Sequence, residues 1–195
     1  DGYKNLIQLV TKSFLEGFYY KPRIDRELIE KHHDGLIAIS SAFTGDLTLA
    51  FQGNDIAKAE EIANWYKSIF GSDYYLEITH HPDIDGHKTL MERTRIVAKT
   101  TNVPLVASGN VYYIKPEDKQ AQQTLMLVNS SGDDKINDSD LADFSFISNE
   151  TAQNYFRDIP EAIANTEKIA NDCNLELTLG KWIFPKYTVT PGKSY

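Results

Sequence analysis

The residues best placed to carry chemistry follow a short apolar run at positions 103–108. Gly109 and Asn110 end that run, and Tyr112 and Tyr113 come directly after them. An apolar run that contains β-branched residues predicts a strand buried on both faces. In α/β proteins the carboxyl ends of such strands carry the functional groups. We therefore expect the candidate site to lie just after residue 108.

Other polar residues follow or interrupt a second predicted strand, at 74–79. Glu77 alternates with apolar neighbours, so it is either a site residue or a carboxylate paired with Lys or Arg. His80 and His81 could bind adventitious zinc or nickel, although an ordinary loop position is the preferred interpretation. Phosphate-binding patterns of the GxGxxG or GxxxxGK[ST] type are absent from the sequence.

An aspartate-rich loop follows at 133–140. It faintly resembles a calcium-binding loop, but it lacks the required glycine and the distal glutamate, so we interpret it as a solvated loop.

Strand and helix patterns alternate along the chain, which predicts an α/β protein with a largely parallel sheet. We expect strands at 35–40, 74–79, 103–108 and 144–147, too few to close an eight-stranded barrel. Helical spacing and capping residues predict the intervening helices, with Asp25 and Ser148 among the caps. The tail at 175–195 contains Pro185 and Pro191 and predicts a linker.

The composition fits one domain with a sizeable core. The chain has 195 residues, 41% hydrophobic and 25% charged, with no apolar run long enough to cross a membrane. A net charge of −8 argues against broad attraction to DNA phosphates. Cys173 is the only cysteine, which excludes an internal disulfide and favours the cytoplasm. The opening residues, Asp1 and Gly2, lead us to expect the interior of a longer protein.

One loop combines aromatic and basic residues at 18–23. Tyr19, Tyr20, Lys21 and Arg23 lie within it. The preferred interpretation is that the aromatic rings close one edge of the core and that Arg23 pairs with an acid. The alternative is an interaction loop.

Seven stretches of the sequence resemble one family in the same order. They resemble the PHP (polymerase and histidinol phosphatase) domain of bacterial replicative DNA polymerase III alpha subunits. The stretches are GYKNL at 2–6, LEGFYYKPRID at 15–25, GLIAIS at 35–40, YLE at 75–77, PLVA at 104–107, PEA at 160–162 and CN at 173–174. The run at 16–25 is the most specific, because ten matching residues of mixed chemistry do not arise from packing alone.

The resemblance implies a distorted seven-stranded β/α barrel that can hold a cluster of metal ions. In the family a His-x-His pair supplies the first ligands, and it lies before the point where this chain starts. We therefore expect a partial barrel whose early strands are missing. Residues 1–174 would form the partial PHP domain, and residues 175–195 would be the linker toward the polymerase palm.

The later ligand positions of the family are altered here. The family has Asn-Asp-Val-His-Tyr after the central strand, where this chain has GNVYY at 109–113. By resemblance, Asn110 replaces an aspartate, Tyr112 replaces a histidine and Ala42 replaces a cysteine, while His81 remains. A hydrolytic metal site needs several ligands and an open position for water. The resemblance thus implies vestigial positions, no intact metal set and no catalytic residues.

These observations favour a structural and interaction module within a replicative DNA-directed DNA polymerase. The resemblance implies that Mg²⁺ and nucleotides are handled elsewhere in the full subunit, and that this fragment has no cofactor of its own. The implied partners are the palm and thumb and a proofreading exonuclease subunit, with DNA reached only through the full subunit. We also expect the fragment to self-associate and to avoid membranes. The alternatives are a metal-dependent phosphoesterase or 3′–5′ exonuclease, and an acidic partner-binding domain unrelated to replication.

Overall fold

Three short parallel strands form the centre of the protein. The computed structural model describes residues 2–129, 142–182 and 184. Strands β1 (Ala38–Ser40), β2 (Tyr74–Ile78) and β3 (Leu105–Ala107) lie in the order β1-β2-β3, and both neighbouring pairs are parallel. The predicted α/β class with a parallel sheet is confirmed, and within the described residues the sheet is open.

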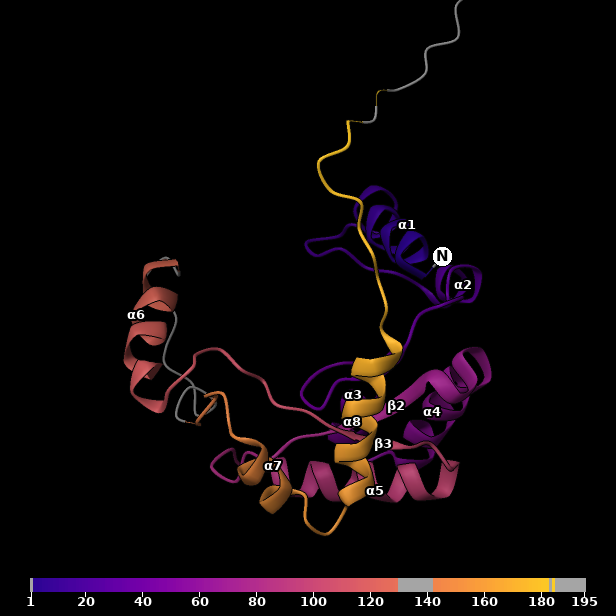
Figure 1. The fold of residues 1–195 in the computed structure, drawn as a ribbon. Coiled ribbons are helices and arrows are strands. Elements are labelled where there is room, and N and C mark those ends of the chain that lie inside the picture. The colour runs from indigo at the N-terminus through magenta and orange to yellow at the C-terminus, as the bar shows by residue number, and fades with distance from the viewer. Residues whose placement is uncertain (1, 130–141, 183, 185–195) are drawn as a thin grey trace, which may run out of the picture.

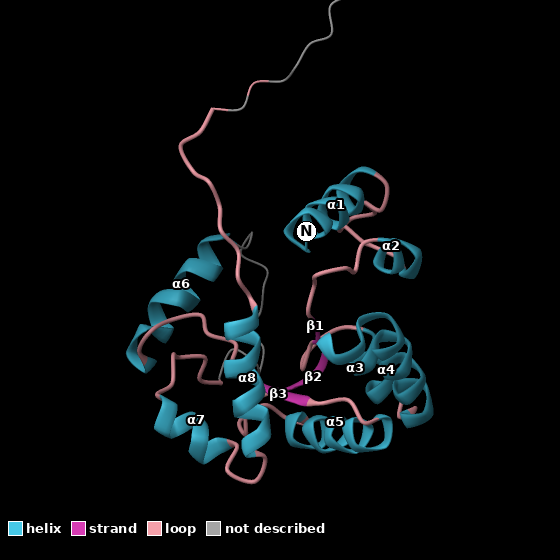
Figure 2. Cartoon of the chain, turned by 45° about the vertical axis from the view of Figure 1, so that its right-hand side comes forward, coloured by secondary structure: helices cyan, strands magenta, loops and turns pink. Residues whose placement is uncertain are grey.

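Helices cover the two faces of this sheet (Figures 1 and 2). Tyr74 and Leu76 pack into a core with α3 (Asp46–Gln52), α4 (Ile56–Phe70) and α5 (His87–Thr101). The opposite face of β2 carries Tyr75, whose hydroxyl accepts a hydrogen bond from Lys168 at 3.2 Å. Lys168 belongs to α8 (Pro160–Asp172), so the sheet lies between α8 and the α3–α5 group.

Helix α8 also covers the outer edge of β3. Asn165 donates from Nδ2 to the carbonyl of Leu105 at 2.7 Å, and Thr166 donates from Oγ1 to the carbonyl of Ala107 at 2.5 Å. Two outward carbonyls of β3 are therefore satisfied by side chains. An unpaired strand edge invites association, and in this protein β1 is the edge that lacks such cover from α8.

Local capping determines where several helices begin. Asp25 accepts from the N–H of Leu28 at the start of α2 (Arg26–Lys31). Asp55 caps α4 in the same way, and Ser148 caps α7 (Asn149–Tyr155). A side-chain oxygen at this position satisfies a backbone donor that has no partner within the helix.

Helix α1 (Gly2–Leu15) lies apart from the helices that surround the sheet (Figure 2). Asn5 links α1 to the turn that precedes β1, because its Nδ2 donates to the carbonyl of Asp34 at 2.8 Å. The backbone of Gly2 approaches Gly35 so closely that a Cβ on Gly2 would lie 1.9 Å from the Gly35 carbonyl oxygen. Much of the apolar side of α1 remains exposed.

Several strands are shorter than the sequence predicts. The run at 35–40 forms a strand only from Ala38, because Gly35 adopts a φ of 72° and belongs to a turn. The run at 103–108 narrows to Leu105–Ala107. The expected strand at 144–147 is reduced to one parallel bridge between Tyr113 and Ser145.

A short 3-10 turn, η1 (Gly71–Asp73), links α4 to β2. A second one, η2 (Pro116–Asp118), leads into α6 (Lys119–Asn129). The aspartate-rich loop at 133–140 lies outside the described residues, as does most of the tail. Residues 175–182 are exposed and form neither helix nor strand, and their role as a linker stays a prediction. Among the described helices, none has the length and apolarity needed to span a membrane.

Candidate functional site

The carboxyl ends of the three strands meet at one edge of the sheet. Because the strands are parallel, the segments that begin at Ser41, Thr79 and Ser108 leave the sheet side by side. This edge is where open α/β sheets hold ligands. The four positions that the sequence assigns to a vestigial metal site all follow these strands.

A carboxylate on β2 ties the strand ends together. Oε2 of Glu77 accepts from the backbone N–H of Ala42 at 2.6 Å, and Oε1 of Glu77 accepts from the hydroxyl of Ser108. The N–H of Glu77 itself donates to Oγ of Ser40 at 3.3 Å. The idea that Glu77 pairs with Lys or Arg is wrong, because its partners are a backbone N–H and a hydroxyl.

His81 lies at the centre of an aromatic cluster beside this carboxylate. Its side chain is 7% exposed, and its ring centroid lies 5.5 Å from that of Phe43 and 4.7 Å from that of Phe144. Nε2 is buried and has no hydrogen-bond partner within the part of the chain that the structure describes. Burial, assisted by His87 and His80, lowers the pKa of His81, while the backbone of Asp143 opposes the shift. The imidazole is therefore held in its neutral form.

The neighbouring histidines are also held neutral, but by different contacts. Nε2 of His87 lies 3.0 Å from Oγ1 of Thr79, and burial lowers the pKa of His87. His80 stacks on Tyr155 with 4.0 Å between ring centroids. Burial lowers the pKa of His80, and Asp83 partly offsets that effect. This edge of the sheet thus carries no imidazolium charge near neutral pH.

Asn110 and Tyr112 lie on a segment that pairs with residues 144–146. The N–H of Tyr112 donates to the carbonyl of Phe144 at 3.0 Å, and the N–H of Phe146 donates to the carbonyl of Tyr113 at 3.0 Å. The hydroxyl of Tyr113 accepts from the N–H of Phe144 at 2.9 Å. These bonds fix the backbone that presents Tyr112, whose ring centroid lies 5.0 Å from that of Phe144.

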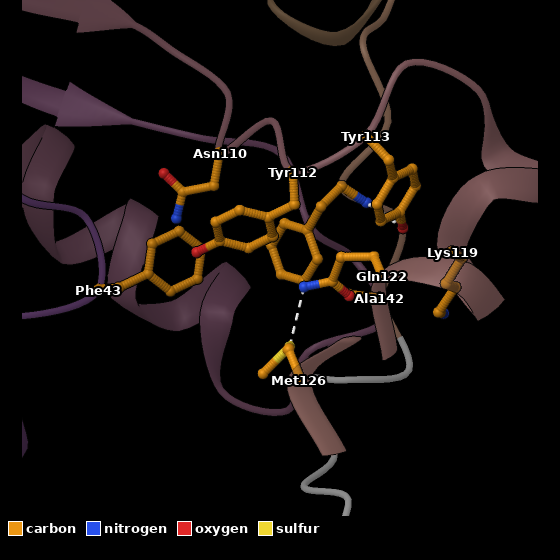
Figure 3. A pocket seen from close by; sticks show the side chains of 9 residues that line it. Phe43, Asn110, Tyr112, Tyr113, Lys119, Gln122, Met126 and Ala142 are labelled. Atoms are coloured by element: carbon orange, nitrogen blue, oxygen red, sulfur yellow. Dashed lines mark hydrogen bonds between the residues drawn. The ribbon is translucent and has the colours of Figure 1, made fainter. Parts of the chain in front are cut away.

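Two adjoining hollows open beside this segment. The larger, of about 430 Å³, is lined by rings and amides from Phe43, Asn110, Tyr112, Gln122 and Phe144, among others. Figure 3 shows the Asn110 amide and the Tyr112 ring extending toward Phe43, with Gln122 of α6 in hydrogen-bond contact with Met126. The smaller hollow, of about 230 Å³, also includes Asn110 and Phe144 in its wall.

The side chains at this edge do not fit a catalytic metal cluster. Ala42 is buried and has no donor atom, and its N–H is already engaged by Glu77. The amide of Asn110 and the phenol of Tyr112 are weak ligands compared with carboxylate and imidazole. Among the described residues, no group of three or more His, Cys, Asp or Glu side chains could hold a metal ion. His81 is the one strong ligand type left at the four positions.

The aromatic and basic loop lies elsewhere, after α1. Tyr19 and Tyr20 are 64% and 82% exposed, so the expectation that these rings close an edge of the core is wrong. Arg23 lies over the ring of Tyr19 at 5.4 Å, and the expected pairing of Arg23 with an acid is not the contact observed. The N–H of Tyr19 donates to the carbonyl of Lys21 at 3.2 Å, which closes a tight turn with Tyr20 at its tip.

Sequence reasoning missed Phe43, His87 and Phe144 as members of the site. His87 lies within a helix and Phe144 follows a long loop, so no spacing rule connects either of them to His81. The sequence indicated only weakly that Phe43 belongs to the site, because it follows a predicted strand by a few residues. Their roles depend on contacts between distant segments.

A family model described as "PHP domain" matches residues 1–81. Residues 1–81 therefore match the PHP family, as the sequence resemblance predicted.

Three relatives of the chain carry one and the same name. The chain is 35% identical over 193 residues to "DNA polymerase III subunit alpha" of Borreliella burgdorferi, an alignment that covers 96% of this chain and 17% of that protein. It is 35% identical over 212 residues to the protein of the same name from Aquifex aeolicus, and that alignment covers 99% of this chain and 18% of that protein. It is 33% identical over 204 residues to the protein of the same name from Campylobacter jejuni, and that alignment covers 97% of this chain and 17% of that protein. The chain thus spans less than a fifth of the length of these relatives.

Proposed function

We propose that this chain is a structural and interaction module, a degenerate PHP domain within a replicative DNA polymerase III alpha subunit. One observation carries the proposal. The four strand-end positions gather at one edge of the sheet, yet they present Ala42, Asn110 and Tyr112 beside a single buried His81. Such a set cannot fix a metal ion and leave an open position for an attacking water.

The hydrogen bonds of Glu77 support a structural role for the same edge. The carboxylate holds the segments after β1 and β3 together. A bound metal cluster would join such segments by taking ligands from each of them. Hydrogen bonds to a charged group are stronger than neutral ones. These bonds support a role in which protein groups hold the strand ends in place.

The partners follow from the relatives and from the exposed surface. The sequence resemblance supports contact of the module with the palm and thumb of the subunit, with Mg²⁺ and nucleotides handled elsewhere in that subunit. The turn that presents Tyr20, Lys21 and Arg23 offers rings and cations to a partner such as a proofreading exonuclease subunit. With a net charge of −8, the module itself contacts DNA only through the full subunit.

A nuclease assay tests this proposal against the metal-dependent alternative. The purified chain is incubated with a 3′-labelled oligonucleotide and with a chromogenic phosphate ester, in the presence of Mn²⁺, Mg²⁺ or Zn²⁺. We expect release of nucleotide or phosphate no faster than in protein-free buffer. Metal-dependent release that disappears in His81→Ala, but persists in the control His33→Ala outside this edge of the sheet, would show that the alternative is right.

A further inference from the structure

The two adjoining hollows after β3 are lined by different kinds of side chain. The metal-site positions do not explain this difference. The larger hollow has aromatic walls, two primary amides from Asn110 and Gln122, and one cationic side chain, Lys119, on its α6 side. Its volume of about 430 Å³ falls within the range of about 300 to 1,000 Å³ that is usual for small-molecule sites. The smaller hollow shares Asn110 and Phe144 with it and adds hydroxyls and carboxylates to its wall.

Tyr112 offers a surface on which a planar ring can stack. Its side chain is 58% exposed although its backbone is fixed by pairing with Phe144. Phe144 contacts the Tyr112 ring at a tilt of 54°, and the Tyr112 ring also lines the larger hollow. Aromatic side chains stack with every nucleobase, because each base has a π face.

Asn110 supplies hydrogen bonding at the junction of the hollows. Its amide lines both of them, and it has no hydrogen-bond partner among the residues that the structure describes. An amide offers donors and an acceptor together, which suits the edge of a heterocycle with both kinds of group. The amide of Gln122 lies on the α6 side of the larger hollow.

The smaller hollow favours sugar hydroxyls over phosphate. Asp83, Asp143, Ser108 and Ser145 are part of its wall, and none of the described residues that line it is Lys or Arg. His80 and His81 also line it, each packed against an aromatic ring. A phosphate dianion in this hollow would meet two carboxylates and no Lys or Arg of its described wall, whereas sugar hydroxyls can donate to the carboxylates.

We propose that the two hollows together bind a nucleoside, with the base stacked on Tyr112 beside Asn110 and the sugar in the acidic smaller hollow. The binding needs no metal ion. It is also independent of the role in a polymerase, because it depends only on residues after β1, β2 and β3 and on α6.

Saturation-transfer NMR with adenosine and the full chain, in buffer that contains EDTA, tests this proposal. We expect transfer to the base protons, with a Kd of roughly 0.1 to 1 mM. Tyr112→Ala should weaken binding about tenfold, whereas Tyr112→Phe, which keeps the ring, should bind like the unaltered chain. Tyr3→Ala serves as the matched control on α1 and should change nothing.

Competition experiments distinguish the parts of the ligand. Ribose alone should not displace adenosine, and adenosine 5′-monophosphate should bind no more tightly than adenosine. Asn110→Ala should weaken adenosine binding severalfold, which provides a second variant if Tyr112→Ala has a lowered melting temperature. The proposal is overturned by absence of transfer at about 10 mM adenosine, by unchanged binding in both variants, or by tighter binding of the monophosphate.

Discussion

Glu77 is the residue on which the strand-end site depends most. Its carboxylate accepts from Ala42 on one side and from Ser108 on the other, and its N–H donates to Ser40. All three partners lie far from it in the sequence. Removing the charge would leave a partly buried N–H and a hydroxyl with weaker acceptors, and bonds of this kind to a charged group contribute about 1.5–3 kcal/mol.

We therefore expect Glu77→Gln to lower the free energy of unfolding by about 1–3 kcal/mol. Urea denaturation followed by circular dichroism measures this change. The matched control is Glu61→Gln, which removes an exposed carboxylate paired with Lys58 and should cost less than about 1 kcal/mol. Equal losses in the two variants would show that Glu77 does not hold the strand ends together.

The buried histidines make stability depend on pH. Burial lowers the pKa of both His81 and His87 below the ordinary value of 6.5. Below that pH the unfolded chain binds protons that the folded chain does not, so the free energy of unfolding falls as the pH drops. We expect lower stability at about pH 5.5 than at about pH 7.5, measured by urea midpoints. His81→Asn should reduce the pH dependence, and an unchanged slope would contradict this account.

Among the elements, the turn after α1 is held by a close backbone approach. A Cβ on Gly17 would lie 2.0 Å from the carbonyl oxygen of Arg23, so only glycine lets the two arms of the turn meet. Tyr20 at the tip adopts a φ of 59°, which is unusual for a residue with a side chain. The surrounding contacts therefore impose the shape in which Tyr20 and Lys21 are presented.

Gly17→Ala should open this turn and destabilise the protein by about 1–3 kcal/mol. Gly53→Ala is the matched control, because a Cβ there would meet its nearest atoms at an ordinary 3.5 Å. Thermal melting compares the two variants, and hydrogen exchange at residues 17–23 locates the change. A Gly17→Ala protein as stable as the control, with unchanged exchange in the turn, would contradict the close approach.

The elements also show what could be predicted from the sequence. Helix starts were accessible because caps such as Asp25 and Asp55 act within three residues of themselves. The sequence also predicted that the strand ends lie together, because parallel strands end at the same edge of a sheet. The strand at 35–40 was predicted too long, because Gly35 adopts a φ of 72° and an apolar run does not reveal such a turn. The partners of Glu77 and the cluster around His81 join segments that no sequence period relates.

At the scale of the whole molecule, exposed apolar surface is the feature that calls for a partner. Leu6, Val10 and Phe14 lie along α1 with about half of each side chain exposed. Helix α8 covers the edge of β3, which leaves β1 as the strand edge without such cover. Patches of this kind usually mark interfaces. They are the reason why we expect the isolated chain to associate with itself.

We expect light scattering at tens of micromolar to give a mass above the 22.1 kDa of one chain. Replacing Val10 and Phe14 together by glutamate should return the mass to that of a monomer, because charge on the exposed face opposes its burial. The matched control replaces Lys12, on the same helix, by glutamate. A monomeric unaltered chain with a cooperative melting transition would show that the exposed face needs no partner.

Metal content tests the central claim most directly. The chain is purified without chelator, dialysed against a small excess of Mn²⁺, Zn²⁺ and Fe²⁺, and analysed by inductively coupled plasma mass spectrometry. Because Ala42, Asn110 and Tyr112 stand at three of the four gathered positions, we expect well below one equivalent of any metal per chain, with no difference between the unaltered protein and His81→Ala. Two or three equivalents per chain, lost in His81→Ala, would show an intact metal cluster and contradict the account of a degenerate PHP domain.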